Sequence, residues 1–319
     1  MGRCGIIGSE TEEGMTTMQQ TRPAPQKRGT RKRRRRRHPF RTFLILLCLA
    51  GGLILFVKAR NRSSGSPSTL MDGPAPERSS FSQAAPTEDE VLQKLEAAAG
   101  DSADVRYILD HREDYPDSLL TLLAKNGEAL QFVLDYPNHK DDTPPDTIGD
   151  VTWGEIPLLL QWDERWGYTT YGTDFLAVTG CGPTCLSMVA AGLNGDNTIT
   201  PNRVAEFAQS SGYYVDGAGS AWSLMTEGCQ NYGLTGQELP LDENRMRSEL
   251  AAGHPIICSM LPGDFTTKGH FIVIVGAEEE GFRVNDPNSP IRSNQLWSYE
   301  RLSTQIGNLW AFSNRPEQP

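Results

Sequence analysis

The segment that most constrains this chain is Thr179 to Met188, with the sequence TGCGPTCLSM, in which Cys181 lies between two glycines. The small residues predict a turn, and the apolar residues after them predict a helix that begins near Cys181. Pro183 fits the first turn of such a helix, where a backbone N–H is not needed. Because the N-terminal end of a helix carries partial positive charge, it favours a thiolate. The segment therefore predicts a cysteine nucleophile.

A candidate base and its partner lie downstream in a predicted β-hairpin. His270 begins one apolar stretch, Asp286 ends the next, and residues 276–280 lie between them. If 276–280 form a five-residue loop, His270 pairs directly with Asp286, and the Cβ atoms of directly opposite residues are ~5 Å apart. A four-residue loop would place Asn285 on the face of His270 instead. Asn285 is therefore the alternative partner for the imidazole.

These residue types suit acyl transfer. Cys181 would attack an acyl carbon, and His270 would take the thiol proton and later protonate the leaving amine. Asp286 would hold the imidazole in the useful tautomer and stabilise its cation. The oxyanion needs N–H donors, which the backbone of Cys181 and the side-chain amide of Gln161 can supply. Gln161 lies 20 residues before Cys181, at the end of an apolar stretch that we expect to be a strand.

Other interpretations of these residues have weaker support. His254 is a rival base, but no carboxylate follows it at hairpin spacing. Cys181, Cys185 and a histidine can form a zinc site in principle, but a Cys-x3-Cys spacing with one well-placed histidine is a weak signature. We therefore expect neither a metal nor a cofactor. If Cys181 is a free nucleophile, at most one disulfide can form among Cys185, Cys229 and Cys258, and a chain with none fits equally well.

The two ends of the chain differ sharply in charge. Residues 1–60 contain 14 Lys or Arg and 3 Asp or Glu, whereas the remainder contains 16 and 37. The basic block at 31–38 precedes an uncharged apolar run at 43–57, so we expect an uncleaved signal anchor with the basic block on the cytoplasmic side. A cleaved signal peptide that ends near residue 59 is one alternative. An Arg-rich nucleic-acid-binding arm is another, and the apolar run directly behind the block disfavours it.

Composition divides the chain into five expected parts. They are a basic cytoplasmic tail (1–41), a transmembrane signal anchor (42–58), a flexible linker (59–87), a small helical subdomain (88–140) and a catalytic domain (150–315). In the catalytic domain we expect a helix after Cys181, further helices over 202–210, 221–232 and 241–252, and then strands over 255–260, 270–275 and 282–286. Helices first and strands second predict an α+β fold.

Four motifs follow one another along the chain: Gln161, Gly180-Cys181-Gly182-Pro183-Thr184, Gly269-His270-Phe271 and Val284-Asn285-Asp286-Pro287. Their order resembles the papain-like cysteine peptidases, and more closely the bacteriocin-processing-peptidase-like branch, peptidase family thirty-nine (C39-like). The stretch QWDERWGY at 161–168 is similar to the opening of such domains in membrane-anchored proteins of Gram-positive bacteria. The resemblance covers about residues 156–312. It implies a papain-like fold, with the nucleophile on a helical lobe, His270 and Asp286 on an antiparallel sheet lobe, and Gln161 in the oxyanion hole.

The resemblance has one clear departure. The bacteriocin processors are domains of ABC exporters that work on the cytoplasmic side, whereas this chain has one apolar run and no phosphate-binding loop. We therefore expect a single-pass, membrane-anchored extracellular cysteine peptidase that acts on peptide or protein substrates at the cell membrane or cell wall and binds no nucleic acid. The alternatives are a peptidoglycan amidase, endopeptidase or acyl transferase with the same triad, and a non-catalytic binding module on the same fold.

Overall fold

The structure is a computed structural model that describes residues 86–315. The predicted cytoplasmic tail, the predicted signal anchor and residues 59–85 of the predicted linker lie outside this range. In the described part of the chain, none of the helices is both long enough and apolar enough to span a membrane.

Short amphipathic helices come first. They are α2 (Glu88–Ala98), α3 (Ala103–Asp110), α4 (Asp117–Lys125) and α5 (Leu130–His139). Thr87 and Glu90 form a capping box at the start of α2, which satisfies two backbone donors that a helix end otherwise leaves unpaired. α5 contains Pro137 near its C-terminal end. The buried side chains of these helices share one hydrophobic cluster with Tyr168 and Ala177, which lie later in the chain.

The second group of helices surrounds Cys181. They are α6 (Leu176–Thr179), α7 (Cys181–Asn194), α8 (Pro201–Ser210) and α9 (Ser223–Thr226). α7 is buried along almost its whole length and forms the centre of the largest hydrophobic cluster. The single helix expected over 221–232 is wrong, because α9 ends at Thr226 and a 3-10 helix, Gly228–Tyr232, follows it. The strand expected before Gln161 is also wrong, because residues 155–160 have no regular structure.

A six-stranded antiparallel sheet follows these helices in the chain, with the strands in the order β5-β10-β6-β7-β8-β9. The strands are β5 (Leu234–Glu238), β6 (Ile256–Met260), β7 (His270–Glu278), β8 (Gly281–Asn285), β9 (Leu296–Trp297) and β10 (Ile306–Asn314). Two further hairpins lie outside it: β1 (Thr170–Tyr171) with β2 (Asp174–Phe175), and β3 (Tyr214–Val215) with β4 (Gly219–Ser220). The expected α+β class is confirmed, although β5, β9 and β10 were not predicted.

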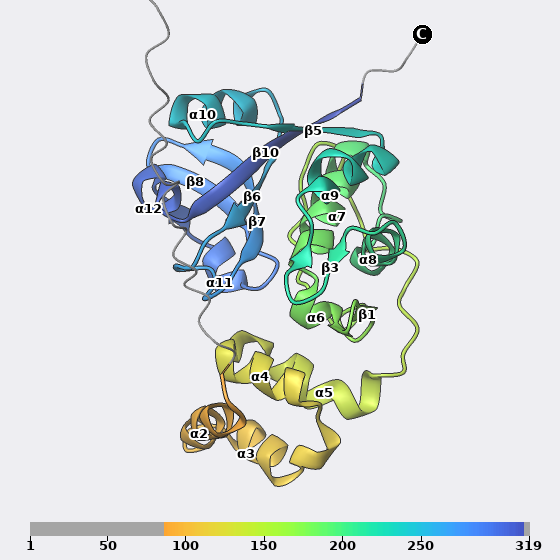
Figure 1. Cartoon of the computed structure of the whole chain (residues 1–319), viewed down its shortest axis with the longest axis vertical. Coiled ribbons are helices and arrows are strands. Elements are labelled where there is room, and N and C mark those ends of the chain that lie inside the picture. The colour runs from red at the N-terminus through yellow and green to blue at the C-terminus, as the bar shows by residue number, and fades with distance from the viewer. Residues whose placement is uncertain (1–85, 316–319) are drawn as a thin grey trace, which may run out of the picture. The chain divides into compact units, whose positions relative to one another are not determined.

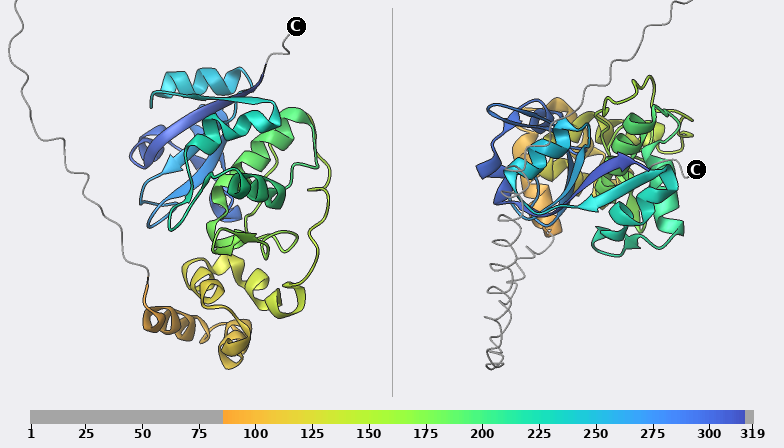
Figure 2. Two further views of the ribbon diagram at one scale, coloured as in Figure 1. Left: turned by 45° about the vertical axis from the view of Figure 1, so that its right-hand side comes forward. Right: turned by 90° about the horizontal axis from the view of Figure 1, so that it is seen from above.

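Helices cover both faces of this sheet. Alternate residues of β7 point to opposite faces, so Phe271 and Val273 pack in the cluster around α7, whereas Ile272 and Ile274 pack in a second cluster. Helices α10 (Glu243–Ala251) and α12 (Tyr299–Ser303) contribute Met246 and Leu302 to the second cluster. Figures 1 and 2 show α7 lying beside the sheet, with α10 and α12 away from α7. The catalytic candidates lie where the N-terminus of α7 meets the start of β7.

The hairpin of β7 and β8 differs from the predicted register. Its turn contains only two residues between the paired Glu278 and Gly281, so the five-residue loop is wrong, and Ile274 pairs with Val284 rather than with Phe282. A register shift between Ile274 and Gly276 marks a β-bulge. Without the extra residue of this bulge, the two-residue turn would place Asp286 opposite Val273. The side chain of Asp286 would then lie on the face of the sheet away from His270. The bulge therefore restores the alignment of Asp286 with the His270 face.

Candidate active site

Cys181 is the first residue of α7 and is half-buried, with a free thiol. The two glycines beside it are required by close packing. A Cβ on Gly180 would lie 2.5 Å from the carbonyl oxygen of Leu176, and a Cβ on Gly182 would lie 2.4 Å from Ser220 Oγ. Neither distance is compatible with a side chain unless neighbouring atoms move. The motif therefore lets α6 and α7 meet at a tight junction that presents the Cys181 thiol at a helix N-terminus.

His270 and Asp286 form a buried hydrogen-bonded pair. The Nε2 atom of His270 lies 2.8 Å from Asp286 Oδ1. Since an ionised carboxylate only accepts hydrogen bonds, Nε2 carries the proton and Nδ1 is left for exchange with another group. The two residues reach each other diagonally across the end of the hairpin rather than as a directly opposite pair. The predicted partnership is thus present, but its register is corrected.

Two further groups bind the Asp286 carboxylate. The backbone N–H of Asn288 donates to Oδ1 at 2.8 Å, and Arg292 Nε donates to Oδ2 at 2.5 Å. The backbone N–H of Asp286 donates to Ser293 Oγ at 2.9 Å. Arg292 and Ser293 lie on the short helix α11 (Pro290–Ser293). The loop from Asp286 to Ser293 therefore folds back to fix the orientation of its own first side chain.

The charges of this pair depend on each other. Burial disfavours the charged imidazole, but the Asp286 carboxylate outweighs burial and, with a smaller contribution from the Cys181 thiol, raises the pKa of His270 above its ordinary value. Burial likewise opposes the charge on Asp286, but His270 and Arg292 outweigh it and lower the pKa of the Asp286 carboxyl. The protonated imidazole is thus favoured at neutral pH, with Asp286 ionised beside it.

Gln161 is buried against the turn that leads to Cys181. Its Nε2 donates to the carbonyl of Ala177 at 2.6 Å, and its backbone N–H donates to the carbonyl of Pro287 at 2.7 Å. The amide has a second N–H that this bond does not use. Its Oε1 is buried without a hydrogen-bond partner among the described residues. Gln161 therefore connects the turn before Cys181 with the loop after Asp286.

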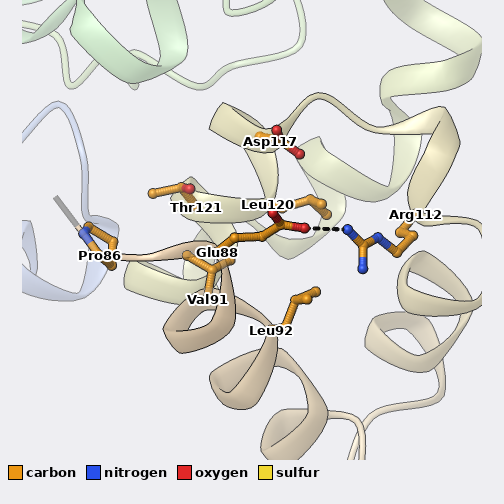
Figure 3. A pocket seen from close by; sticks show the side chains of 8 residues that line it. All are labelled: Pro86, Glu88, Val91, Leu92, Arg112, Asp117, Leu120 and Thr121. Carbon is orange, nitrogen blue, oxygen red and sulfur yellow. Dashed lines mark hydrogen bonds and ion pairs between the residues drawn. The ribbon is translucent and has the colours of Figure 1, made fainter.

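Cys181, His270 and Gln161 line one cleft with a volume of about 410 Å³. Its walls come from three parts of the chain: α2 and α4, the segment from Gly263 to Gly269, and the loop that contains Asn288 and Arg292. A second pocket, of about 220 Å³, lies between α2 and α4 and contains the ion pair of Glu88 with Arg112 (Figure 3). No candidate catalytic residue lines this second pocket. The cleft at Cys181 is therefore the candidate active site.

The N-terminal helical segment holds the loop that follows Asp286. Asn126, directly after α4, donates through Nδ2 to the carbonyl oxygen of Asn288 at 2.7 Å. Glu128 accepts from Ser289 Oγ through one carboxylate oxygen, and from the backbone N–H of Ile291 at 3.0 Å through the other. Trp162 Nε1 also donates to the carbonyl of Asn288, at 3.2 Å. The helices from 88 to 139 thus contribute to the geometry of the site.

Sequence reasoning did not identify Arg292, Asn126 or Glu128. One sequence feature could have indicated Arg292. It follows Asp286 closely in the segment PNSPIR, whose Ser-Pro step is typical of a helix start. The contacts of Asn126 and Glu128 join residues more than 160 positions apart. No pattern in a single sequence indicates such pairs.

The remaining candidates lie elsewhere. Asn285 pairs with Val273 and donates to the carbonyl of Ile156 at 3.1 Å, so it is not the partner of His270. His254 bonds to Glu249 at 2.6 Å and does not line the cleft. The cysteines within residues 86–315 are all free, and three of them, Cys185, Cys229 and Cys258, are buried. Within the same range, no group of three His, Cys, Asp or Glu side chains is placed to hold a metal ion.

A family model that covers about half of the chain identifies its family. The model of the Peptidase_C39 like family matches residues 154–314, about half of the chain. Among solved structures, the peptidase domain of Streptococcus ComA, a bi-functional ABC transporter involved in a quorum-sensing pathway, matches with 19% identity and a TM-score of 0.35 over 44% of this chain and 93% of that one. A Bacillus anthracis protein described as a C39-like peptidase matches with 14% identity and a TM-score of 0.31 over 51% and 96%. No curated protein matches.

Proposed function

Because the chain belongs to the Peptidase_C39 like family, we propose that it is a cysteine peptidase that hydrolyses peptide bonds with Cys181 as the nucleophile. The observation that carries the proposal is the position of His270, which bonds to Asp286 through Nε2 and shares a cleft with the Cys181 thiol. A cysteine, an imidazole and an orienting carboxylate together form the arrangement that nucleophilic acyl transfer requires.

The two ring nitrogens of His270 have separate roles in the proposed reaction. With Nε2 bonded to Asp286, Nδ1 takes the thiol proton to give a thiolate–imidazolium pair, and the Cys181 thiolate of this pair attacks the carbonyl carbon of the scissile bond. Nδ1 then gives this proton to the leaving amine, which departs and leaves a thioester on Cys181. A water molecule, deprotonated by the same nitrogen, hydrolyses the thioester and releases the carboxylic acid. In this proposal Asp286 stabilises the imidazolium at each stage.

Two donors are placed to stabilise the oxyanion in this proposal. The backbone N–H of Cys181 is the first of α7, and the first N–H groups of a helix have no acceptor within it. The second donor is the N–H of Gln161 that the Ala177 carbonyl does not use. Donors that are held before the reaction begins are effective because little reorganisation is needed as charge develops.

The location of the enzyme is also a proposal, and the sequence alone supports it. The basic block at 31–38 before the apolar run at 43–57 favours a single-pass anchor with the N-terminus in the cytoplasm. The peptidase part would then face outward, at the membrane or cell wall, and its substrate would be an extracellular peptide or protein.

Release of fluorescent fragments from labelled casein by the full-length chain tests the function. Cys181→Ala and His270→Ala should each lower the rate at least about 10³-fold, because loss of any member of such a set removes most of its catalysis. Cys185→Ala is the matched control, since it removes a buried thiol one turn further along α7. Hydrolysis that persists undiminished in a folded Cys181→Ala variant would show that the assignment is wrong.

A further inference from the structure

Lysines are concentrated at the catalytic cleft. After residue 60 the chain contains only four lysines, Lys94, Lys125, Lys140 and Lys268, among an excess of Asp and Glu. Lys94, Lys125 and Lys268 line the cleft that holds Cys181 and His270. Lys140 does not line it, and pairs with Asp141. A distribution of this kind in a strongly acidic part of the chain points to a function at the cleft.

The three lysines come from separate segments of the chain that meet at the cleft. Lys94 is on α2 and Lys125 is the last residue of α4, and the helices α2 and α4 pack against each other (Figure 3). Lys268 lies in the segment from Gly263 to Gly269, two residues before His270. Burial lowers the pKa of the Lys125 ammonium group, and the positive charges of Lys268 and Lys94 lower it further. The three groups therefore create one local positive field next to the nucleophile.

Among the residues that the structure describes, the carboxylates near this cleft are bound to groups other than these lysines. Within residues 86–315, none of these three ammonium groups forms an ion pair. Asp264 is the single acidic residue that lines the described cleft, and its carboxylate is bound by Arg301 and by Gln305. The other cations of the cleft, Arg292 and the imidazolium of His270, are both already bound to Asp286. The field of the lysines is thus available to a ligand.

We propose that this cleft binds peptides that carry carboxylate groups, and that Lys94, Lys125 and Lys268 determine the preference. The identification of the occupant as a peptide rests on the proposed peptidase function. A carboxylate can come from an acidic side chain or from the free C-terminus of a peptide, and both present the same group to the lysines. Electrostatic complementarity of this kind raises the association rate and discriminates against cationic partners.

Binding to the full-length Cys181→Ala variant tests the preference without requiring turnover. The probes are fluorescein-labelled peptide mixtures of one length, built on Ala, Ser, Gly and Leu. Three mixtures have amidated C-termini and carry Glu, Gln or Lys at the same positions, and a fourth carries Gln and a free C-terminal carboxylate. Fluorescence anisotropy should show that the Glu mixture or the free-carboxylate mixture binds at least about tenfold more tightly than the amidated Gln mixture. The difference should shrink as salt is added.

Variants of the lysines identify the source of the preference. Lys125→Glu and Lys268→Glu, introduced together into the Cys181→Ala variant, should abolish the preference for carboxylates. They should favour the Lys mixture instead, because the electrostatic field of the cleft changes from positive to negative. Lys140→Glu is the matched control, with the same change of charge on an exposed residue outside the cleft, and should leave the preference intact. Equal binding of the Glu, free-carboxylate, Gln and Lys mixtures, binding of none of them, or an equal effect of Lys140→Glu would overturn the proposal.

Hydrolysis of the same mixtures by the unmodified chain separates this inference from the proposed function. Cleavage without any preference for carboxylates would contradict the lysine proposal and leave the peptidase intact. A clear binding preference without cleavage of any mixture would support the lysine proposal and count against hydrolysis. If only the free-carboxylate mixture binds tightly, the recognised group is the chain end, and if only the Glu mixture does, it is the side chain.

Discussion

At Asp286 a single carboxylate serves three donors. His270 and the backbone of Asn288 bond to Oδ1, and Arg292 bonds to Oδ2. Arg292 can orient the carboxylate because its planar guanidinium holds Oδ2 while Oδ1 remains directed at the imidazole. It also shares the negative charge that would otherwise act on His270 alone. Arg292 is therefore a positioning residue, with two effects that its variants can separate.

The pH dependence of activity should move in opposite directions in two variants. The raised pKa of His270 means that the imidazolium persists above the ordinary range and is lost as the pH rises through the folded value. Asp286→Asn removes the main cause of the raised pKa, so the alkaline limit of activity should move to lower pH. Arg292→Ala leaves Asp286 with only His270 as a charged partner, so the limit should move to higher pH while kcat falls about tenfold or more.

Profiles of kcat and of kcat/KM from pH 5 to 11 measure both shifts and the fall in kcat, since the pKa of His270 is raised to about 10. Arg292→Lys is the control for Arg292→Ala, since it restores the charge and not the planar Nε contact, and should return the alkaline limit without returning all of kcat. Limits that move in the same direction in Asp286→Asn and Arg292→Ala would contradict the assigned roles.

At the scale of the elements, the loop from Asp286 to Ser293 depends on a contact from another part of the chain. The Glu128 carboxylate accepts from Ser289 and from the backbone of Ile291, so it holds the start of α11, the helix that carries Arg292. Glu128 lies in the 3-10 helix Gly127–Ala129 between α4 and α5. A carboxylate at the N-terminus of a helix also interacts favourably with its unpaired N–H groups. The helical segment thus acts on Asp286 through α11.

Replacement of Glu128 should therefore affect catalysis as well as stability. Glu128→Ala leaves two donors of the loop without acceptors, which should cost about 1–3 kcal/mol of unfolding free energy and lower kcat about threefold to tenfold at nearly constant KM. Glu128→Gln keeps an acceptor and should recover most of kcat. Glu96→Ala, on the exposed surface of α2, is the matched control. Steady-state kinetics and thermal denaturation of the same samples test this, and a loss of stability with unchanged kcat would refute the proposed coupling.

The limits of prediction from sequence are clear at this hairpin. Apolar stretches predicted β6, β7 and β8, and the order of Cys181, His270 and Asp286 was readable because each lies at a recognisable start or end of an element. The register of the hairpin could not be predicted, because one bulged residue near Val275 changes which side chains share a face of the sheet. A bulge has no reliable pattern in a single sequence. The predicted contact of His270 with Asp286 survived because the shorter turn and the bulge changed the alignment in compensating ways.

For the whole molecule, the main feature that sequence could not show is the sharing of one core. The sequence predicts residues 88–140 as a separate helical subdomain, yet the buried side chains of its helices pack with Tyr168 and Ala177, and Tyr168 donates to the carbonyl of Phe132 at 2.7 Å. Composition gives the helices but not the surface on which they pack. The same packing forms one wall of the cleft from α2 and α4. Lys94 and Lys125 are far apart in the sequence, and only the fold brings them together in this wall of the cleft.

The rate at which iodoacetamide alkylates Cys181 as a function of pH tests directly whether Cys181 and His270 act as nucleophile and base. Mass spectrometry of the Cys181 peptide from the full-length chain separates this thiol from the other five. We expect rapid alkylation already at pH 6, a rate at least about tenfold lower at that pH in His270→Ala, and no change in His254→Ala, because an adjacent imidazolium favours the thiolate. Alkylation of Cys181 that is slow at pH 6 and indifferent to the loss of His270 would contradict the assignment of these two residues as nucleophile and base.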